Sequence, residues 1–331
     1  MAKDKKIKIL MMGGRRCGKT SVLAAMDDCC VDVLACSDME VKIVEGSNEL
    51  ALKKAEAEKY FSATEKKKMK FIPDMLPSPL DSIYTYQVEI GGKNIGYDLE
   101  FHDFPGEYLT RADQKENLQN WFNESQVIIV AIDTPHLVEK VDEISGVGKY
   151  HTEFNRVNEI TRYFKSAFKN GMYNKMVVFV PLKCEKYYYR NDMDTVIDMT
   201  KKGYGELLEY LASPDISSIC TVAIAPILTF GGAEFLKFKA DSYVGEYNYR
   251  SKPEDEYLPL GCEHPLFLVL KYLVNIAKNN TSKRGKVLRW FDVNLFNKID
   301  LDSLVDCEEE INDIINSKKD LPVIFLQDPL I

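Results

Sequence analysis

One segment constrains the fold of this chain more than any other: residues 13–20, with the sequence GGRRCGKT. It fits the pattern G-x-x-x-x-G-K-[ST], and a chance match somewhere in 331 residues is roughly one in a hundred. The apolar run Lys6–Met12 precedes it and has the character of a strand. Thr20–Cys30 follows, with apolar residues near one face of a helix. This order of strand, glycine-rich loop and helix is the arrangement in which such a loop binds phosphate.

The residue types in this loop suit a polyphosphate. Glycine lets the backbone wrap closely around an anion, and the loop N–H groups and the positive helix N-terminus attract negative charge. Lys19 is expected to reach the β- and γ-phosphates of a nucleotide, and the Thr20 hydroxyl to bind Mg²⁺. The alternative is an ordinary glycine-rich turn. The residues expected to bind the nucleotide here are Gly13, Arg16, Cys17, Gly18, Lys19, Thr20 and Ser21.

Short apolar runs alternate with helical patterns along the chain, such as the helical spacing over Thr152–Lys169, which indicates an α/β fold. The continuous apolar runs Val127–Asp133 and Met176–Leu182 suit central strands that are buried on both faces. Ile83–Ile90 and Asn94–Phe101 flank a Gly-Gly-Lys turn, so they predict an antiparallel hairpin. The sequence therefore predicts a three-layer α/β sandwich of the P-loop NTPase type. Its central sheet is expected to be mostly parallel, with one antiparallel hairpin strand, insertions and a C-terminal extension.

A second motif, D-x-x-G, begins where the second hairpin strand is expected to end, at Asp103. A carboxylate at the end of a strand beside the phosphate loop can hold Mg²⁺, directly or through a water. Gly106 can offer its backbone N–H to a γ-phosphate. Clusters of Asp, Pro and Gly also make plain turns, so the motif is weak alone. Its position after the phosphate loop favours the metal site.

Together, these features resemble Ras-like GTPases of the translation-factor-related TRAFAC class of P-loop proteins. The shared run is a strand, GGRRCGKT, a helix, a hairpin and DFPG. The form DFPGEYL is most similar to bacterial members such as the YcjX-like family. The resemblance covers Lys6–Ala277, with its specific motifs in the first third. It implies a molecular switch that binds GTP or GDP with Mg²⁺ and hydrolyses GTP.

The resemblance also implies a base-reading N/T-K-x-D motif after Met176–Leu182. Here the residues are Leu182, Lys183, Cys184 and Glu185. The stem of Lys183 can lie across a purine ring, and the Glu185 carboxylate can accept from guanine N1–H and N2–H₂. Leu182 lacks the polar side chain of the pattern. Guanine is therefore favoured over adenine, although a protein that uses ATP stays an alternative. A further alternative is that Lys183 and Glu185 are solvated loop charges with no role in binding a base.

Members of this class also use a hydroxyl ahead of the hairpin to complete the Mg²⁺ shell. Ser82 and Ser78 fall near the right distance before Asp103, and Thr85 is a third candidate. Ser82 is the expected ligand. Each of the three can equally be a plain loop residue.

The catalytic residues implied are Lys19, Glu107 and Arg15. Glu107 stands where typical members carry a water-orienting Gln. A carboxylate can orient water, but it repels the γ-phosphate and offers no amide donor. Arg15 occupies a position that is often Gly, where it either crowds an arginine finger from a partner or acts as a finger in cis. Hydrolysis is therefore expected to be slow or to depend on a partner.

The chain is longer than this class requires. We expect one P-loop GTPase domain over residues 1–280, with a helical insertion at about residues 37–80, and an extension packed on it over residues 281–331. A loop near Thr229–Leu260 contains further residues beyond those that this class requires. The insertion and the switch loops are expected to present a surface to a protein partner, although a purely structural role for the insertion stays open.

Composition narrows the partners. Lys and Arg number 43 against 51 Asp and Glu, so the net charge is −8, which argues against a nucleic-acid partner. The longest aliphatic run, Val127–Ile132, is too short to cross a bilayer, so no integral membrane segment is expected. The first residues lack the apolar core of a signal peptide, and no two cysteines have C-x-x-C spacing. These features favour reduced thiols and a cytoplasmic location.

Two other functions remain open from the sequence. One is a module that binds nucleotide with little hydrolysis, which Glu107 and Arg15 favour. The other is a nucleotide or small-molecule kinase. Against a kinase, the arginines are scattered and form no lid motif.

Overall fold

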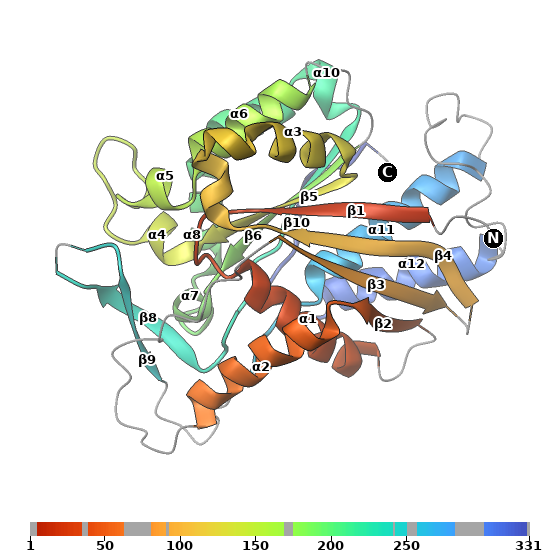
Figure 1. Ribbon diagram of the computed structural model, residues 1–331, viewed down its shortest axis with the longest axis horizontal. Helices are drawn as coiled ribbons and strands as arrows, with labels where there is room; N and C mark the ends of the chain where they lie inside the picture. Colours follow the sequence, from red (N-terminus) through yellow and green to blue (C-terminus); the bar gives the residue numbers. More distant parts are fainter. Residues whose placement is uncertain are drawn as a thin grey trace.

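The computed structural model describes residues 5–34, 39–62, 81–90, 93–168, 175–240, 242–249, 257–281 and 301–329. These residues form a central sheet with the strand order β10-β7-β6-β5-β1-β4-β3-β2 (Figure 1). The strands of this sheet are β1 (Lys5–Met12), β2 (Met39–Glu45), β3 (Ser82–Ile90), β4 (Lys93–Asp103), β5 (Val127–Asp133), β6 (Lys175–Leu182), β7 (Cys220–Ile224) and β10 (Ile324–Gln327).

The centre of the sheet is parallel. Strand β1 pairs in parallel with β4 and β5, and the series continues through β6 to β7. Every residue of β5 and β6 is buried, as their unbroken apolar sequences predict. Because the strands are parallel, their carboxyl ends meet at one edge of the sheet, where ligands of α/β proteins bind. The predicted α/β class, with a mostly parallel sheet, is confirmed.

Antiparallel pairs extend the sheet at both sides. Strands β3 and β4 form the predicted hairpin, and β2 then pairs antiparallel with β3. At the other side, β10 pairs antiparallel with β7. The chain after residue 300 thus adds α12 (Leu301–Asn316) and the edge strand β10 to the same structure. The division into domains at residue 280 stays a prediction.

The expected insertion at about residues 37–80 is not purely helical. Its first described part is strand β2, which joins the main sheet, and α2 (Ser47–Ser62) follows directly. Sequence patterning predicts the helix but not the strand. Residues 35–38 and 63–80 lie outside the described part of the chain.

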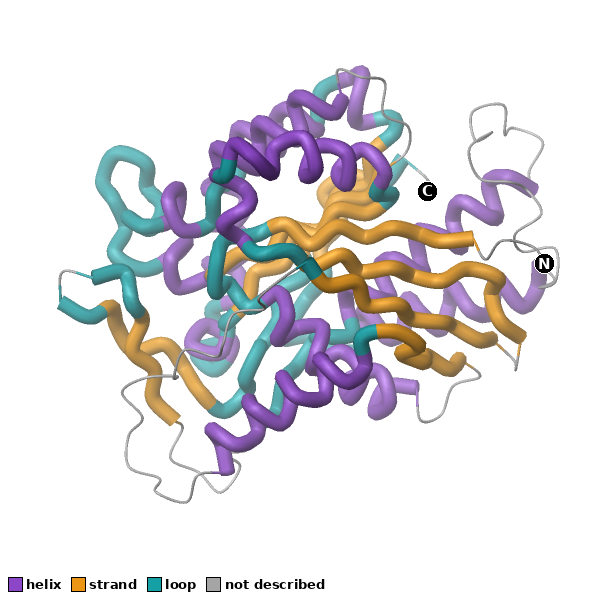
Figure 2. The backbone as a smooth tube through the Cα atoms, viewed as in Figure 1, coloured by secondary structure: helices purple, strands orange, loops and turns teal. Residues whose placement is uncertain are grey.

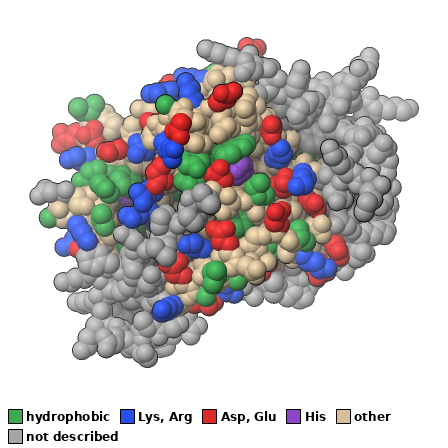
Figure 3. Space-filling model, viewed as in Figure 1, with side chains coloured by type: hydrophobic (Ala, Val, Ile, Leu, Met, Phe, Trp, Pro, Cys, Tyr) green, Lys and Arg blue, Asp and Glu red, His purple; other side chains and the backbone are tan. Residues whose placement is uncertain are grey.

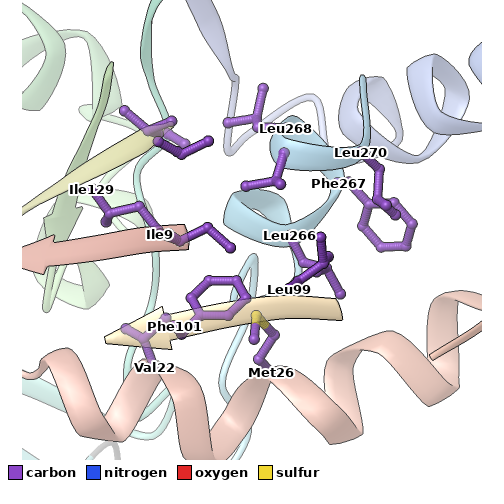
Figure 4. Packing of buried hydrophobic residues seen from close by; sticks show 14 of the residues in the cluster. Ile9, Val22, Met26, Leu99, Phe101, Ile129, Leu266, Phe267, Leu268 and Leu270 are labelled. Carbon is purple, nitrogen blue, oxygen red and sulfur yellow. The ribbon is translucent and has the colours of Figure 1, made fainter. Parts of the chain in front are cut away.

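Helices cover both faces of the sheet, which gives the predicted three layers (Figure 2). Adjacent residues of β1 divide between the two faces: Ile9 packs in one apolar cluster and Leu10 in the other. Figure 4 shows the first cluster, in which Val22 and Met26 of α1 point toward Phe101 of β4. The helices of this face are α1 (Lys19–Leu34), α2, α11 (His264–Thr281) and α12. The opposite face carries α3 (Lys115–Glu124), α6 (Val157–Phe168), α8 (Met193–Gly203), α9 (Gly205–Leu211) and α10 (Pro214–Ser217).

Short elements surround the carboxyl edge of the sheet. The segment near Thr229–Leu260, where the sequence predicts a loop, contains a separate two-stranded sheet, β8 (Ala233–Phe238) and β9 (Gly245–Tyr249). The remaining short elements are η1 (Gly106–Thr110), η2 (Ala112–Gln114), α4 (Thr134–Val138), α5 (His151–Phe154) and α7 (Glu185–Tyr188).

The described surface mixes the two signs of charge. On the face shown in Figure 3, acidic and basic side chains are interspersed. Among the helices that the structure describes, none combines the length and the apolar character needed to span a bilayer.

Candidate functional site

The phosphate loop connects β1 to α1 at the carboxyl edge of the sheet, as predicted. Its turn needs two residues with left-handed backbone: Arg16 has φ 62° and Gly18 has φ 116°. Gly14 is also required, because a Cβ added there would overlap the carbonyl oxygen of Phe154. The first turn of α1 begins at the loop, with Val22 N donating to Gly18 O at 3.1 Å. The loop N–H groups therefore lie at a helix N-terminus, which favours an anion.

The residues predicted for phosphate and metal meet at this loop. The Thr20 hydroxyl donates to Asp103 Oδ2 at 2.5 Å, and Lys19 Nζ lies 3.9 Å from Asp103 Oδ1. Lys19 Nζ also donates to Gly13 O at 3.3 Å. Burial raises the pKa of Asp103, and the nearby ammonium of Lys19 partly offsets this effect. The structure thus brings Lys19, Thr20 and Asp103 together from segments more than 80 residues apart.

The pair Thr20 and Asp103 fits a divalent cation. Asp103 is 2% exposed, and its Oδ1 atom has no hydrogen-bond partner among the described residues. A buried carboxylate oxygen without a donor is costly unless a further charge satisfies it. Carboxylate and hydroxyl oxygens are the hard ligands that Mg²⁺ prefers. These two side chains would therefore hold Mg²⁺.

Ser82 lies beside this pair. It is the register partner of Asp103 in the β3–β4 ladder, and its hydroxyl donates to Glu49 Oε2 at 3.1 Å. Thr85 points to the opposite face of the sheet and donates to Glu45 at 3.0 Å. Ser78 lies outside the described residues. Of the hydroxyls considered, Ser82 is the described one that neighbours Asp103, and its role as a metal ligand stays a prediction. Sequence reasoning missed Glu49 of α2, because no motif near Glu49 in the sequence indicates that it contacts Ser82.

Two of the three side chains predicted for catalysis, Arg15 and Glu107, bind each other. Arg15 Nε and Glu107 Oε1 form an ion pair at 2.9 Å, with both side chains about half exposed. Gly106 lies directly on the loop, since a Cβ added there would overlap the backbone of Gly14 and Arg15. The positive charge of Arg15 offsets the repulsion that Glu107 would exert on a phosphate. An exposed ion pair contributes little stability, so the pair can open when a ligand binds.

Lys183, which the sequence predicts to read a base, lies beside the phosphate loop at the carboxyl edge of the sheet. It follows β6 with φ 60°, and its ammonium donates to Arg16 O at 3.0 Å and to Asp133 Oδ2 at 2.5 Å. Asp133 ends β5 as the register partner of Leu182. Burial alone would raise the pKa of Asp133, but the charges of His136 and Lys183 hold it well below its usual range. Asp133 therefore supplies a polar group beside the apolar Leu182.

Glu185 is placed differently from the prediction. It is 1% exposed, and its Oε1 atom accepts from Phe230 N at 2.7 Å and Gly231 N at 3.2 Å. In this conformation the carboxylate holds the loop that follows β7 and does not line the cleft. The prediction that Glu185 reads a base is therefore unsupported by its geometry. Thr229 of the same loop accepts from Lys183 N at 3.1 Å, so this loop lies beside Lys183.

Glu185→Gln is expected to remove a pH dependence of folding. Burial raises the pKa of the Glu185 carboxyl from 4.5 to about 7, so the folded protein holds a proton that the unfolded chain releases. The free energy of unfolding therefore falls as the pH rises from about 4.5 to 7, by up to roughly 3 kcal/mol. Glutamine keeps an oxygen acceptor for the two amides. Urea unfolding at about pH 5 and pH 8 should show a smaller difference for the variant; equal differences would contradict this.

These residues surround a cleft of about 450 Å³, a size that accommodates a small ligand. One end is formed by the phosphate loop and residues 103–107, and the other by Asp133, Lys183 and Phe230. Sequence reasoning missed several lining residues that distant elements bring to the cleft: Lys53, His136, Phe154, Arg156, Tyr243 and Tyr247.

His136 joins two sides of this cleft. Its ring stacks on that of Phe154, with centroids 4.1 Å apart. Its Nδ1 lies 2.5 Å from Asp133 Oδ1, and its Nε2 lies 2.9 Å from Tyr243 O. The loop between β8 and β9 is therefore fastened to the end of β5.

Comparisons with known proteins assign no family. No protein-family model matches the chain, and no curated protein matches it. Among solved structures it is similar to the GTPase-like domain of Ski7 from S. cerevisiae, bound to GTP, at 15% identity and a TM-score of 0.37. The match covers 67% of this chain and 43% of that one, so it spans less than half of the Ski7 chain. At this TM-score the likeness does not establish a function, and the YcjX-like resemblance stays a prediction.

Proposed function

We propose that this chain is a Mg²⁺-dependent switch protein that binds guanine nucleotides and hydrolyses GTP to GDP, slowly or with a partner. The observation that carries the proposal is the meeting of Lys19, Thr20 and Asp103 at the N-terminus of α1. A buried ammonium, a hydroxyl and a buried carboxylate at one phosphate loop are the groups that a Mg²⁺-bound triphosphate needs.

Each group has a separate task in this proposal. The loop amides and Lys19 would bind the β- and γ-phosphates, while Thr20 and Asp103 would hold Mg²⁺. The metal, when bound, would neutralise phosphate charge. Gly106 rests on the phosphate-loop backbone, so a γ-phosphate entering here would contact its N–H and order the segment that begins with η1.

Guanine is the base that we propose, and adenine is the alternative. Lys183 supports a purine, because Asp133 and the carbonyl of Arg16 fix its stem beside the phosphate loop. Glu185 holds the loop at Phe230 and Gly231, which follows β7 and lies beside Lys183. The guanine proposal rests on the sequence spacing of Lys183 and Glu185, and direct reading of guanine by Glu185 would require its carboxylate to leave the two loop amides.

Slow hydrolysis is supported by the Arg15–Glu107 ion pair, since a paired carboxylate without an amide donor orients water poorly. Single-turnover cleavage of GTP by the purified chain tests this. The proposal expects slow conversion to GDP and phosphate. Binding without any conversion, alone or with cell extract added, would favour the alternative of a nucleotide-binding module.

Asp103→Asn is expected to weaken Mg²⁺-dependent binding of GTP by about 10- to 100-fold. The amide keeps the shape of the side chain but loses the charge that a metal needs. In EDTA the variant should bind GTP as tightly as the wild type or more tightly, because a repulsive carboxylate is gone. Titration of labelled GTP in both buffers measures this. Asp113→Asn is the matched control, since Asp113 pairs with Arg111 on the surface; equal losses in both buffers would contradict the metal role.

The setting of the protein is also part of the proposal. The switch segments near Ser82 and residues 103–108, with the region of residues 37–80, would contact a protein partner. Six cysteines, Cys17, Cys29, Cys30, Cys184, Cys220 and Cys262, are free and buried, which suits a reducing compartment such as the cytoplasm.

A further inference from the structure

The junction between α5 and α6 has an unusual backbone. α5 ends at Phe154, α6 begins at Val157, and between them Arg156 has φ 53°. Sequence patterning predicts one continuous helix over Thr152–Lys169, so this break is unexpected. A bulky residue with left-handed backbone costs free energy, and such residues concentrate at functional sites.

A buried side chain fixes this junction to the sheet. Asn155 is 0% exposed; its Oδ1 accepts from Asp133 N at 2.7 Å and its Nδ2 donates to Asp133 O at 3.1 Å. The same amide contacts His151 Nδ1 at 2.9 Å. These bonds hold the residues on either side of Asn155 at the end of β5.

The junction packs against the phosphate loop. The carbonyl oxygen of Phe154 contacts Gly14 so closely that no Cβ fits between them, and Arg156 Cγ lies 3.9 Å from where that Cβ would be. Arg156 also lines the cleft, and Gly106 approaches the same part of the loop. Its side chain therefore starts beside the end of the loop where Gly106 would meet a γ-phosphate.

The guanidinium of Arg156 is available to a ligand. Within the described part of the chain, it makes no hydrogen bond or ion pair with any residue, including its neighbour Glu153 in the cleft lining. Arg15, for which the sequence leaves open a role as a finger in cis, is instead paired with Glu107. The contacts of the described residues thus give the Arg156 guanidinium no role in stabilising the fold, although the residue has left-handed backbone and lies beside the phosphate loop.

We propose that Arg156 is a catalytic arginine supplied in cis, which contacts the terminal phosphate of the bound triphosphate. This rests on the proposed function. During hydrolysis the water oxygen forms a bond to the γ-phosphorus, and the bond from that phosphorus to the β–γ bridging oxygen breaks. GDP leaves with the electron pair, and the proton of the water passes to inorganic phosphate. Arg156 stabilises the negative charge that develops on the bridging and γ-oxygens.

Single-turnover GTP cleavage by Arg156→Ala tests this proposal. The rate constant is expected to fall by at least about 100-fold, since a catalytic arginine contributes more than this in related chemistry. Affinity for GDP should change by less than about threefold, because Arg156 acts beyond the β-phosphate. Arg156→Lys should recover little, because an ammonium lacks the planar fork of donors. Arg162→Ala, on the exposed side of α6, is the matched control.

A second variant and a second readout keep the test decisive. Arg156→Gly relieves the left-handed backbone, so it should fold at least as well as the wild type and lose the same activity. GDP with aluminium fluoride, a stand-in for the γ-phosphoryl group in transfer, should form a stable complex with the wild type and not with either variant.

The outcomes separate this proposal from the proposed function. Cleavage and aluminium fluoride binding that match the Arg162→Ala control would overturn the role of Arg156 and leave the GTPase proposal standing. Equal losses of GDP and GTP affinity with an unchanged rate constant would also overturn it, because Arg156 would then only bind. A wild type that binds GDP without forming the aluminium fluoride complex would also overturn the role of Arg156. A wild type that binds no nucleotide would overturn both this role and the proposed function.

Discussion

Lys19→Met is expected to weaken binding of Mg²⁺–GTP by roughly 30-fold to several thousand-fold. Lys19 is 7% exposed, and its ammonium lies between Gly13 O and Asp103 at the start of α1. Removing one partner of a buried, hydrogen-bonded charge pair costs about 2–5 kcal/mol, which sets this range. Methionine fills a similar volume without the charge. Equilibrium titration with a fluorescent GTP analogue measures the change.

A surface lysine provides the control for this result. Lys165 pairs with Glu206 on exposed parts of α6 and α9, and Lys165→Met should change GTP affinity by less than about twofold. Circular dichroism should show the same helix content in both variants. If Lys19→Met binds Mg²⁺–GTP as tightly as Lys165→Met, the phosphate site has been wrongly placed.

Gly14→Ala is expected to destabilise the fold by about 1–3 kcal/mol and to weaken nucleotide binding by at least about tenfold. The added Cβ would overlap the carbonyl oxygen of Phe154. That carbonyl cannot move away freely, because the next residue, Asn155, is fixed to Asp133 through two hydrogen bonds. The phosphate loop must therefore shift, which misplaces the amides that would bind phosphate. Urea unfolding and GTP titration measure the two effects.

Gly205→Ala is the matched control for Gly14→Ala. A Cβ at Gly205 meets nothing within 4 Å, and the residue begins α9 away from the cleft. Alanine there should leave stability unchanged or raise it by up to about 1 kcal/mol. If the two variants were equally stable and bound GTP equally, the close contact between the loop and Phe154 would have no role in holding the site.

The phosphate end of the site is predictable from sequence because its geometry is local. Residues 13–20 encode their own turn and helix start, and the apolar run before them predicts β1. Asp103 follows from the same logic, since a hairpin strand beside β1 must end near the loop. The register of β3 and β4 places Ser82 opposite Asp103. The number of residues between Ser82 and Asp103 in the sequence already favours Ser82 as the neighbouring hydroxyl.

The base end is harder to predict because contacts distant in sequence decide it. The motif suggests that Lys183 and Glu185 both face a base, yet Glu185 binds the amides of Phe230 and Gly231. Asp133 partners Lys183, although the two are 50 residues apart. Side-chain chemistry alone does not reveal which backbone amides lie within reach of a carboxylate, and tertiary packing determines this.

Two elements differ from their sequence patterns for physical reasons. Thr152–Lys169 has continuous helical spacing, but Asn155 forms buried hydrogen bonds to Asp133 and the helix breaks there. Met39–Glu45 lies in the segment expected to be a helical insertion, but it forms a strand because it pairs along the edge of β3. Both outcomes depend on neighbours that are distant in the sequence.

Titration of the purified chain with GTP, GDP and ATP in Mg²⁺ tests the central claim most directly. We expect GTP and GDP to bind at least about tenfold more tightly than ATP, because a site that hydrogen-bonds one base leaves polar groups unpaired with another. In EDTA the affinity for GTP should fall, since Thr20 and Asp103 would then hold no metal. Tighter binding of ATP would contradict the guanine assignment, and no binding of any of the three would contradict the nucleotide site itself.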